Sequence, residues 1–399
     1  MRLPRVRRAV PVFRSVLRLS VILPAVFPAA CDRPVSPRVS PPILEDRLAW
    51  YVSGHAGAGI PTSDATTAFF ATIEHYIIAV DKASGAVRWT ARPNPSDRDI
   101  HPLALVRAGN CLLVNDRDVW CLDPATGAVK WRLPSPAGFR AGYRIPTVAG
   151  GVVFTGSTSG HVFAIDLVTG ELRWQTQLAT ETNVFSPIVR DGTVYVTTNH
   201  LPPPPALITG GLTALDAATG AIQWTVDLPI TIPTLGSPTR EAVVSGDLVV
   251  ATTLDGYVYA YHRADGSVAW RGERASVSPG LEPRDQDLRV LGSNDSFIFV
   301  GSSAQGSLTT LRQRDGSVAW TRNLEFDTPF WIRIFDGDVW VTTIGGRVLA
   351  FDPATGIPTE RFDSPLLPPG REAFSAVAAD DRLIYLAADG GLFAFRRRS

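Results

Sequence analysis

The sequence lacks the residue patterns on which most enzyme and metal sites depend. No two of its six histidines stand at the spacing of a metal-binding pair such as H-x-x-x-H. No nucleophile elbow surrounds Ser186 or Ser237, and no helix pattern follows the glycine-rich stretch 54–59. The histidines are predicted to be isolated surface or core residues: His55, His75, His101, His161, His200 and His262. We therefore expect no catalytic residue, no metal and no cofactor.

The chain also has no formal net charge, because its 38 basic residues balance its 38 acidic ones. The balance is uneven along the chain, since residues 1–30 hold six arginines and no acid. Without that segment the chain would carry about six net negative charges. A nucleic-acid-binding protein needs a basic face, so we expect no nucleic-acid partner.

A long hydrophobic run is absent from the N-terminal region. A membrane-spanning helix takes roughly 20 apolar residues, and the apolar stretch Leu19–Ala30 is shorter than this. Because it follows the arginines and ends in small residues, it predicts a signal peptide over residues 1–30. The residues directly before Cys31 resemble the lipobox of bacterial lipoproteins, although Pro28 stands where that motif prefers leucine. We expect Cys31 to carry a lipid; the alternative is an ordinary secretory signal that leaves Cys31 as a free thiol.

Residues 31–45 are predicted to form an extended, proline-rich tether. Four prolines within Asp32–Pro42 exclude a helix or a central strand. Such a spacer would hold a folded body away from a membrane. Asp32 resembles the signal by which some enteric bacteria retain lipoproteins at the inner membrane. The expected location is the periplasm-facing cell envelope, with the outer membrane favoured and the inner membrane left open.

A short phrase, Asp-x-x-Thr/Ser-Gly-x-x-x-Trp, recurs along the rest of the chain. Clear copies occupy 81–89, 123–131, 166–174 and 216–224, and looser copies end at Trp270 and Trp320. A seventh copy, beginning at Asp352, has Glu360 where tryptophan is expected. The tryptophans lie 42 to 50 residues apart, and a period in the forties made of short strands is typical of propeller blades.

Each residue of the phrase has a physical role in a strand–turn–strand unit. The aspartate accepts backbone N–H bonds and opens the turn, and the glycine supplies the positive φ of a tight hairpin. The tryptophan, a large side chain with one N–H to satisfy, is predicted to be a wedge between blades. The predicted structural tryptophans are Trp50, Trp89, Trp131, Trp174, Trp224, Trp270 and Trp320.

Two further strands precede each phrase, which gives four strands per blade. The last copy of the third strand, residues 390–395, has no fourth strand after it. Residues 46–52 contain Trp50 at the wedge position and are predicted to complete that blade. We therefore expect an all-β, eight-bladed β-propeller of four-stranded antiparallel blades over residues 46–399, closed by its N-terminal strand. Seven blades is the competing count.

Cysteine is scarce, with three residues, and two of them stand close together. Cys111 and Cys121 fall on consecutive strands of the second blade. An exported protein meets an oxidising compartment, so we predict a disulfide between them. The alternative is two small buried thiols at neighbouring positions, because a register one residue off would put them on opposite faces.

The phrase resembles the repeat of the PQQ-type β-propellers, and residues 164–174 and 214–224 match it closely. One branch of this family, the quinoprotein dehydrogenases, binds pyrroloquinoline quinone and Ca²⁺ in the central channel. The other branch, the BamB-type lipoproteins, is non-enzymatic. The chain lacks the adjacent cysteine pair and the large insertions of the dehydrogenases.

The BamB branch implies a lipid-anchored scaffold, not an enzyme, that binds other proteins in outer-membrane β-barrel assembly. We expect a monomer with a protein partner in the β-barrel assembly machinery and membrane contact through the N-terminal lipid. The alternatives are a small PQQ-dependent dehydrogenase and a general envelope propeller that binds a peptide or glycan. Two connections are candidate binding surfaces: the four-proline insert 200–208, a docking element or a spacer, and residues 272–287.

Overall fold

The computed structural model describes residues 47–54, 57–93, 104–115, 117–134, 143–179, 182–200, 209–228, 241–253, 257–272, 288–303, 305–325, 327–345, 347–363, 377–388 and 391–397. All of these residues lie in one compact unit, Pro41–Ser399. Their regular elements are β-strands, and these ranges hold no helix with the length and apolar character to cross a bilayer.

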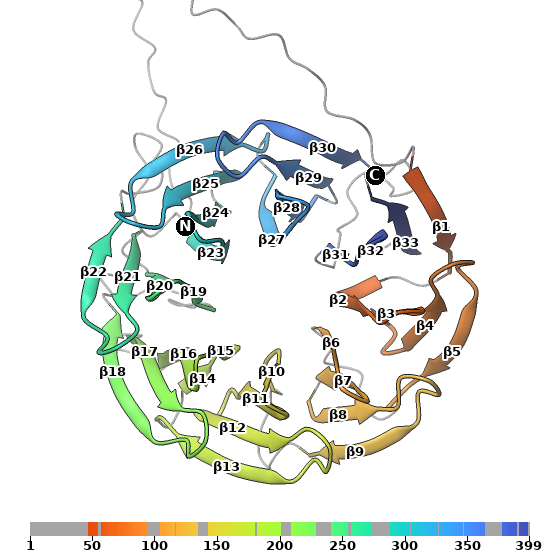
Figure 1. The fold of residues 1–399 in the computed structure, drawn as a ribbon, viewed down its shortest axis with the longest axis horizontal. Helices are drawn as coiled ribbons and strands as arrows, with labels where there is room; N and C mark the ends of the chain where they lie inside the picture. Colours follow the sequence, from red (N-terminus) through yellow and green to blue (C-terminus); the bar gives the residue numbers. More distant parts are fainter. Residues whose placement is uncertain are drawn as a thin grey trace, which may run out of the picture. The chain divides into compact units, whose positions relative to one another are not determined.

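The strands form eight separate antiparallel sheets, which are the blades of a ring (Figure 1). Blade 1 consists of β2 (Gly57–Ser63), β3 (Thr67–Thr72), β4 (Ile77–Asp81) and β5 (Val87–Ala91). Blade 2 consists of β6 (Leu105–Ala108), β7 (Cys111–Asn115), β8 (Val119–Leu122) and β9 (Val129–Leu133). Blade 3 consists of β10 (Thr147–Ala149), β11 (Val152–Gly156), β12 (His161–Asp166) and β13 (Leu172–Gln177). Blade 4 consists of β14 (Thr182–Val184), β15 (Ile188–Arg190), β16 (Thr193–His200), β17 (Thr209–Asp216) and β18 (Ile222–Leu228).

The second half of the ring repeats this plan. Blade 5 consists of β19 (Val243–Ser245), β20 (Leu248–Thr252), β21 (Val258–His262) and β22 (Val268–Arg271). Blade 6 consists of β23 (Leu288–Ser293), β24 (Phe297–Ser302), β25 (Ser307–Arg312) and β26 (Val318–Asn323). Blade 7 consists of β27 (Pro329–Phe335), β28 (Asp338–Thr343), β29 (Arg347–Phe351) and β30 (Pro358–Asp363). Blade 8 consists of β31 (Ala378–Ala379), β32 (Leu383–Ala388), β33 (Gly391–Arg396) and β1 (Leu48–Val52).

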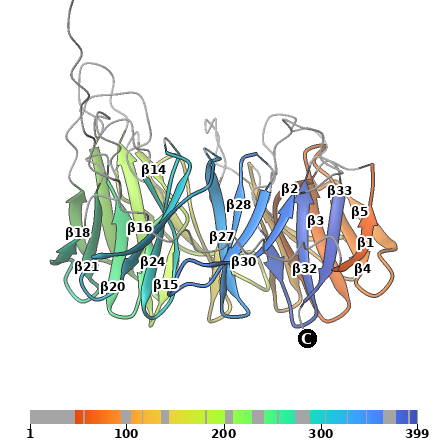
Figure 2. The ribbon, with the colours of Figure 1, turned by 90° about the horizontal axis from the view of Figure 1, so that it is seen from above.

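The predicted eight-bladed, all-β propeller is confirmed. β1 pairs antiparallel with β33, with Trp50 opposite Ala394, so the N-terminal strand completes the last blade. Figure 2 shows the blades from the side, with their strands running between the two faces of the ring. Closure by pairing removes the open sheet edges that an incomplete ring would expose.

Blade 4 departs from the plan of the other blades in its first strand. Its first strand is broken into β14 and β15, which both pair with β16. Pro187 lies in the break, and proline has no N–H to donate to a ladder. The break therefore has a local cause in the sequence.

The core lies between the blades, with one apolar cluster at each of the eight interfaces. Between blades 2 and 3, for example, Leu113 and Val119 pack with Phe163 and Ile165. At the closure, Phe70 of blade 1 packs with Tyr385 and Leu392 of blade 8. Since each blade is buried mainly by its two neighbours, stability depends chiefly on the blade-to-blade contacts.

Candidate functional site

The tryptophans of the repeat connect each blade to the next through one recurring contact, which we call the inter-blade latch. Each indole Nε1 donates to a backbone carbonyl in the third-to-fourth-strand turn of the next blade, at 2.9 or 3.0 Å. The donor and acceptor pairs are Trp50–Lys82, Trp89–Pro124, Trp131–Leu167, Trp174–Ala217, Trp224–Arg263, Trp270–Gln313 and Trp320–Pro353.

The turn glycine is the second half of the latch, because the indole ring lies directly on it. A Cβ built on Gly220 would lie 2.6 Å from the Trp174 ring, and the other six latches show the same close approach. All seven glycines also have positive φ, for example 72° at Gly220. The repeat therefore requires glycine twice, for backbone conformation and for space.

The turn aspartates of the repeat are occupied by local contacts. The Oδ1 atom of Asp81 accepts from the backbone N–H groups of Ala83 and Ser84 at 3.0 and 2.9 Å. Hydrogen bonds from the Arg88 guanidinium and from Ser84 hold the pKa of Asp81 well below its usual value. The corresponding bond from Arg173 lowers the pKa of Asp166 in the same way. These carboxylates build turns.

Blades 5 and 6 make the same turn without an aspartate at its first position. His262 and Arg312 stand there, and their backbone C=O groups accept from the glycine N–H groups four residues on, at 2.9 Å. The aspartates of these two turns lie three residues later and accept from Ser267 and Ser317. The recurring aspartate of the phrase does not mark this position in the two looser copies, but counting four residues back from each glycine finds it.

The eighth latch is absent, and an ion pair stands in its place. Glu360 lies opposite Ala350, where the other blades have tryptophan. β33 and β1 are not consecutive in sequence, so blade 8 has no hairpin turn between them that could accept an indole. Glu360, which is 3% exposed, forms an ion pair with Arg47, the residue directly before β1. The exception in the repeat thus lies at the ring closure.

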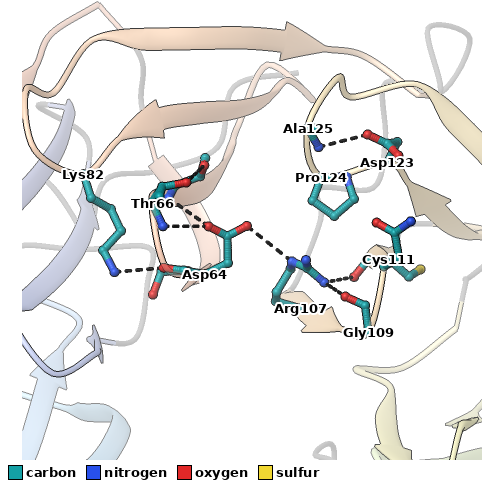
Figure 3. Close-up of polar contacts among 12 residues, drawn as sticks. Asp64, Thr66, Lys82, Arg107, Gly109, Cys111, Asp123, Pro124 and Ala125 are labelled. Carbon is teal, nitrogen blue, oxygen red and sulfur yellow. Dashed lines mark hydrogen bonds and ion pairs between the residues drawn. The ribbon is translucent and has the colours of Figure 1, made fainter.

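Further polar contacts run from blade 8 across blade 1 to blade 2. Asp380 accepts from the Tyr385 hydroxyl at 2.5 Å and from Lys82. Lys82 also donates to the backbone oxygen of Asp64 at 2.8 Å, and the Asp64 carboxylate lies 3.6 Å from Arg107 Nε (Figure 3). Burial alone would raise the pKa of Asp380, but the bonds from Lys82 and Tyr385 lower it to about 2.

The two cysteines of blade 2 lie side by side in the interface with blade 3. Cys121 lies opposite Leu113, so Cys111 is its diagonal neighbour on the same face of the sheet. Their Cα atoms are 5.4 Å apart, within the range of roughly 4.4–6.8 Å that a disulfide spans. The observed register therefore places both cysteines on the same face of the sheet, and their sulfur atoms are positioned to form a disulfide.

The innermost strands enclose a pocket at the end of the ring where these strands begin. An apolar cluster of Ile60, Ala104, Ile145 and Trp331 packs across blades 1, 2, 3 and 7. Beside it lies a cavity of about 230 Å³ that touches blades 3 to 7. Its lining is formed by Arg144, Ile145, Ser186, Glu241, Ala242, Val243, Arg289, Val290, Leu291, Phe330 and Trp331. We call this cavity the channel pocket.

Three charged side chains from three blades converge on the channel pocket. The Arg144 guanidinium lies 5.1 Å from the centre of the Phe185 ring, and that of Arg289 lies 5.7 Å from the centre of the Phe330 ring. Glu241 accepts a hydrogen bond from Ser186 at 3.2 Å. Burial lowers the pKa of Arg144, and attraction to Glu241 opposes that shift. Ser186 lacks the nucleophile elbow that a catalytic serine needs, and no sequence pattern singles out the three charged residues.

A larger cavity, of about 610 Å³, lies at the ring closure. It is lined by residues of blades 1 and 8, including Lys82, Arg88, Arg382 and Arg397. Their charges are engaged nearby: Arg88 pairs with Asp81 at 2.5 Å, and Lys82 pairs with Asp380. The channel pocket is therefore the better candidate for ligand recognition.

Other predicted residues either scatter over the ring or fall outside the description. His75, His161, His200 and His262 lie on four different blades, and the described ranges hold no cluster of His, Cys, Asp and Glu suited to a metal ion. Outside the described residues lie His55, His101, Ser237, Cys31, the signal and tether segments 1–45, residues 201–208 of the proline insert and residues 273–287 of the second connection.

Comparison with known families identifies the repeat. A family model described as outer membrane protein assembly factor BamB matches residues 115–281 and 254–399, together more than half of the chain. The chain belongs to the BamB family. The predicted resemblance to PQQ-type propellers of this branch is confirmed.

Curated members of the family resemble the chain at low identity. The assembly factor BamB of Yersinia pestis is 26% identical over 62% of this chain and 63% of its own length. BamB of Escherichia coli K12 is 28% identical over 51% of this chain and 50% of its own length. The chain therefore spans between half and two thirds of the length of these two relatives.

Solved structures of both branches of PQQ-type propellers share the fold. BamB of Moraxella catarrhalis is 18% identical, with a TM-score of 0.54 over 86% of this chain and 82% of its own. The quinohemoprotein alcohol dehydrogenase of Comamonas testosteroni is 15% identical, with a TM-score of 0.65 over 88% of this chain and 76% of its own. At these identities the likeness speaks for the fold alone.

Proposed function

We propose that this protein is a lipid-anchored scaffold of the cell envelope that binds other proteins and takes part in assembling outer-membrane β-barrels, without enzymatic activity. The observation that carries the proposal is the family match over residues 115–399. Residues 1–30 would act as the signal peptide, Cys31 would carry the lipid, and residues 31–45 would connect it to a monomeric propeller. The outer membrane is the proposed location.

The repeated residues are engaged in holding the blades together, and this supports a binding role for the rest of the surface. Tryptophan and glycine are engaged in the latches, and aspartate is engaged in the turns. Residues that do not follow the repeat therefore carry recognition. Among the described residues the channel pocket gathers the most distinctive set of these, with cations, an acid and aromatic rings from several blades.

A pull-down from envelope extracts tests the proposal. Full-length protein with a C-terminal tag is recovered from its native cell in mild detergent, and the co-purified proteins are identified by mass spectrometry. We expect components of the β-barrel assembly machinery, and recovery of none of them would overturn the proposal. A Cys31→Ala variant tests the anchor separately, because it should move the protein from the membrane fraction to the soluble periplasmic fraction.

The second candidate function is that of a small PQQ-dependent dehydrogenase. It is favoured by the shared fold with the quinohemoprotein alcohol dehydrogenase. Addition of PQQ and Ca²⁺ to the purified protein should then give tight binding and dye-linked alcohol oxidation. Under the scaffold proposal neither is expected.

A further inference from the structure

The channel pocket is lined by positively charged side chains and by apolar ones. Both guanidiniums lie within cation–π distance of aromatic rings, Arg144 by Phe185 and Arg289 by Phe330. Such contacts hold the planar groups in place, and the planar donor fork of arginine matches a carboxylate. Ile145 and Trp331 line the cavity and also belong to the apolar cluster across the inner strands. An occupant therefore needs an acidic group next to an apolar one.

Among the described residues that line the pocket, positive charges outnumber negative ones. Two arginines face one acid, Glu241, which already accepts from Ser186. The Nε of Arg144 is buried and has no hydrogen-bond partner among the described residues. A buried donor without a partner is costly, and a carboxylate acceptor would remove that cost. The pocket thus favours an anion over a neutral or cationic group.

The size of the pocket decides between a small molecule and a side chain. Pockets for drug-sized ligands and cofactors take roughly 300–1,000 Å³, whereas this cavity measures about 230 Å³. One or two side chains of a protein partner fit that volume. A buried anchor of this kind is how a small part of an interface supplies most of its binding energy.

We propose that the channel pocket is an anchor site for an acidic peptide segment of a protein partner, with a carboxylate between Arg144 and Arg289 and a neighbouring apolar side chain against Trp331. The inference rests on the proposed protein-binding function and adds to it the site and the chemistry of the partner. The partner inserts its segment at the end of the ring where the inner strands begin, beside β10, β19, β23 and β27 (Figure 1).

Selection of peptides from a random display library tests the proposal on the full chain. An Arg144→Gln/Arg289→Gln variant serves for counter-selection. We expect enriched peptides to carry Asp or Glu next to an aromatic or aliphatic residue. Changing that acid to its amide should weaken binding about tenfold or more. Failure to enrich any peptide over the double variant would overturn the proposal, as would enrichment without an acid.

Variants of opposite sign separate recognition from loss of folding. Arg144→Gln should weaken the selected peptides about tenfold or more, whereas Glu241→Gln should strengthen them several-fold, because it removes the competing negative charge. General destabilisation cannot produce the second result. Arg314→Gln is the matched control, since Arg314 is 78% exposed and does not line the pocket, and it should change nothing. Equal binding by all variants contradicts the proposal.

The pull-down from envelope extracts also separates failure of the pocket as an anchor site from failure of the scaffold function. If the wild-type protein recovers the assembly machinery and the Arg144→Gln/Arg289→Gln variant recovers it equally well, the pocket is not the anchor and the scaffold function stands. If the wild-type protein recovers none of it, the function itself fails, whatever the peptide selection gives.

Discussion

At the scale of single residues, the turn glycine serves two purposes that substitution can separate. Gly220 has a φ of 72°, and its added Cβ would lie 2.6 Å from the Trp174 ring. Gly192, in another turn of the same blade, has a φ of 77° and nothing within 4 Å of an added Cβ. The two sites therefore share the backbone conformation and differ in the latch.

We predict that Gly192→Ala costs about 1–2 kcal/mol for the left-handed conformation, and that Gly220→Ala costs at least about 2 kcal/mol more because the ring must move. Urea unfolding of the two variants measures the difference. Equal losses would mean that the contact between the ring and the glycine contributes nothing beyond the turn.

The cysteine pair makes a second prediction at this scale. If the proposed disulfide forms, the purified protein takes up no alkylating agent at Cys111 or Cys121 until it is reduced and unfolded, as mass spectrometry will show. Reduction should cost about 2–3 kcal/mol for a loop with a sequence separation of 10. A Cys111→Ala/Cys121→Ala variant is the control, because reductant should not change its stability. Alkylation of the native, unreduced protein would contradict the disulfide.

Asp380 gives a prediction for pH. Its pKa is about 2 in the folded protein against an ordinary 3.8, so its carboxylate stabilises the fold above about pH 4. That contribution, at most about 2 kcal/mol, is lost as the pH falls from 4 through 2. Asp380→Asn should therefore be less stable than the wild type at pH 6 and similar to it at pH 2. A difference that stays constant over this range in acid unfolding experiments would argue against the charged contact with Lys82.

At the scale of elements, the strand that closes the ring is attached by an ion pair at the position where the other blades of the repeat have tryptophan. Glu360 is buried, whereas the side chain of Arg47 is 22% exposed, and the two residues lie 313 positions apart in sequence. Removing one partner deprives the other of this ion pair at a largely buried interface. The cost should exceed that of an exposed ion pair, which is typically below about 1 kcal/mol.

We predict that Arg47→Met costs about 2–4 kcal/mol and that Glu360→Gln in the same chain recovers part of it. Glu360→Trp, which restores the consensus of the repeat, should destabilise the protein, because no turn is present to receive the indole. Thermal unfolding of the three variants decides this. A stabilising Glu360→Trp would show that the consensus outweighs the ion pair.

The elements were predictable to the extent that their causes are local. The turns, the strands around them and the position of the closing strand follow from Asp, Gly and Trp at fixed spacing, and the structure has them. His262 and Arg312 escaped notice because the turn needs only a backbone carbonyl at that position. Arg144, Glu241 and Arg289 could not be predicted as one site, because they meet at the ring centre from three blades and no sequence spacing encodes that convergence.

At the scale of the whole molecule, closure joins strands from opposite ends of the described chain. β1 contributes Trp50, which is 7% exposed and latches onto Lys82 of blade 1. It also contributes Tyr51, whose ring stacks on Phe393 at 4.8 Å. β1 therefore completes the sheet of blade 8, and its Trp50 connects blade 8 to blade 1. In a ring where each blade packs mainly against its neighbours, the effect of losing β1 should fade with distance around the ring.

Deletion of residues 1–52 tests this dependence, with deletion of residues 1–46 as the control that keeps β1. We predict that only the longer deletion raises backbone hydrogen exchange in β32, β33 and β4, because it exposes the edge of β33 and removes the Trp50 latch. Strands β16 and β20 on the far side should keep their protection. A synthetic peptide of residues 46–53 should restore protection in trans, since it can rebuild the pairing with β33 and the contact with Lys82. Uniform loss of protection around the ring would instead mean that the propeller folds as one cooperative unit and that closure stabilises every blade alike.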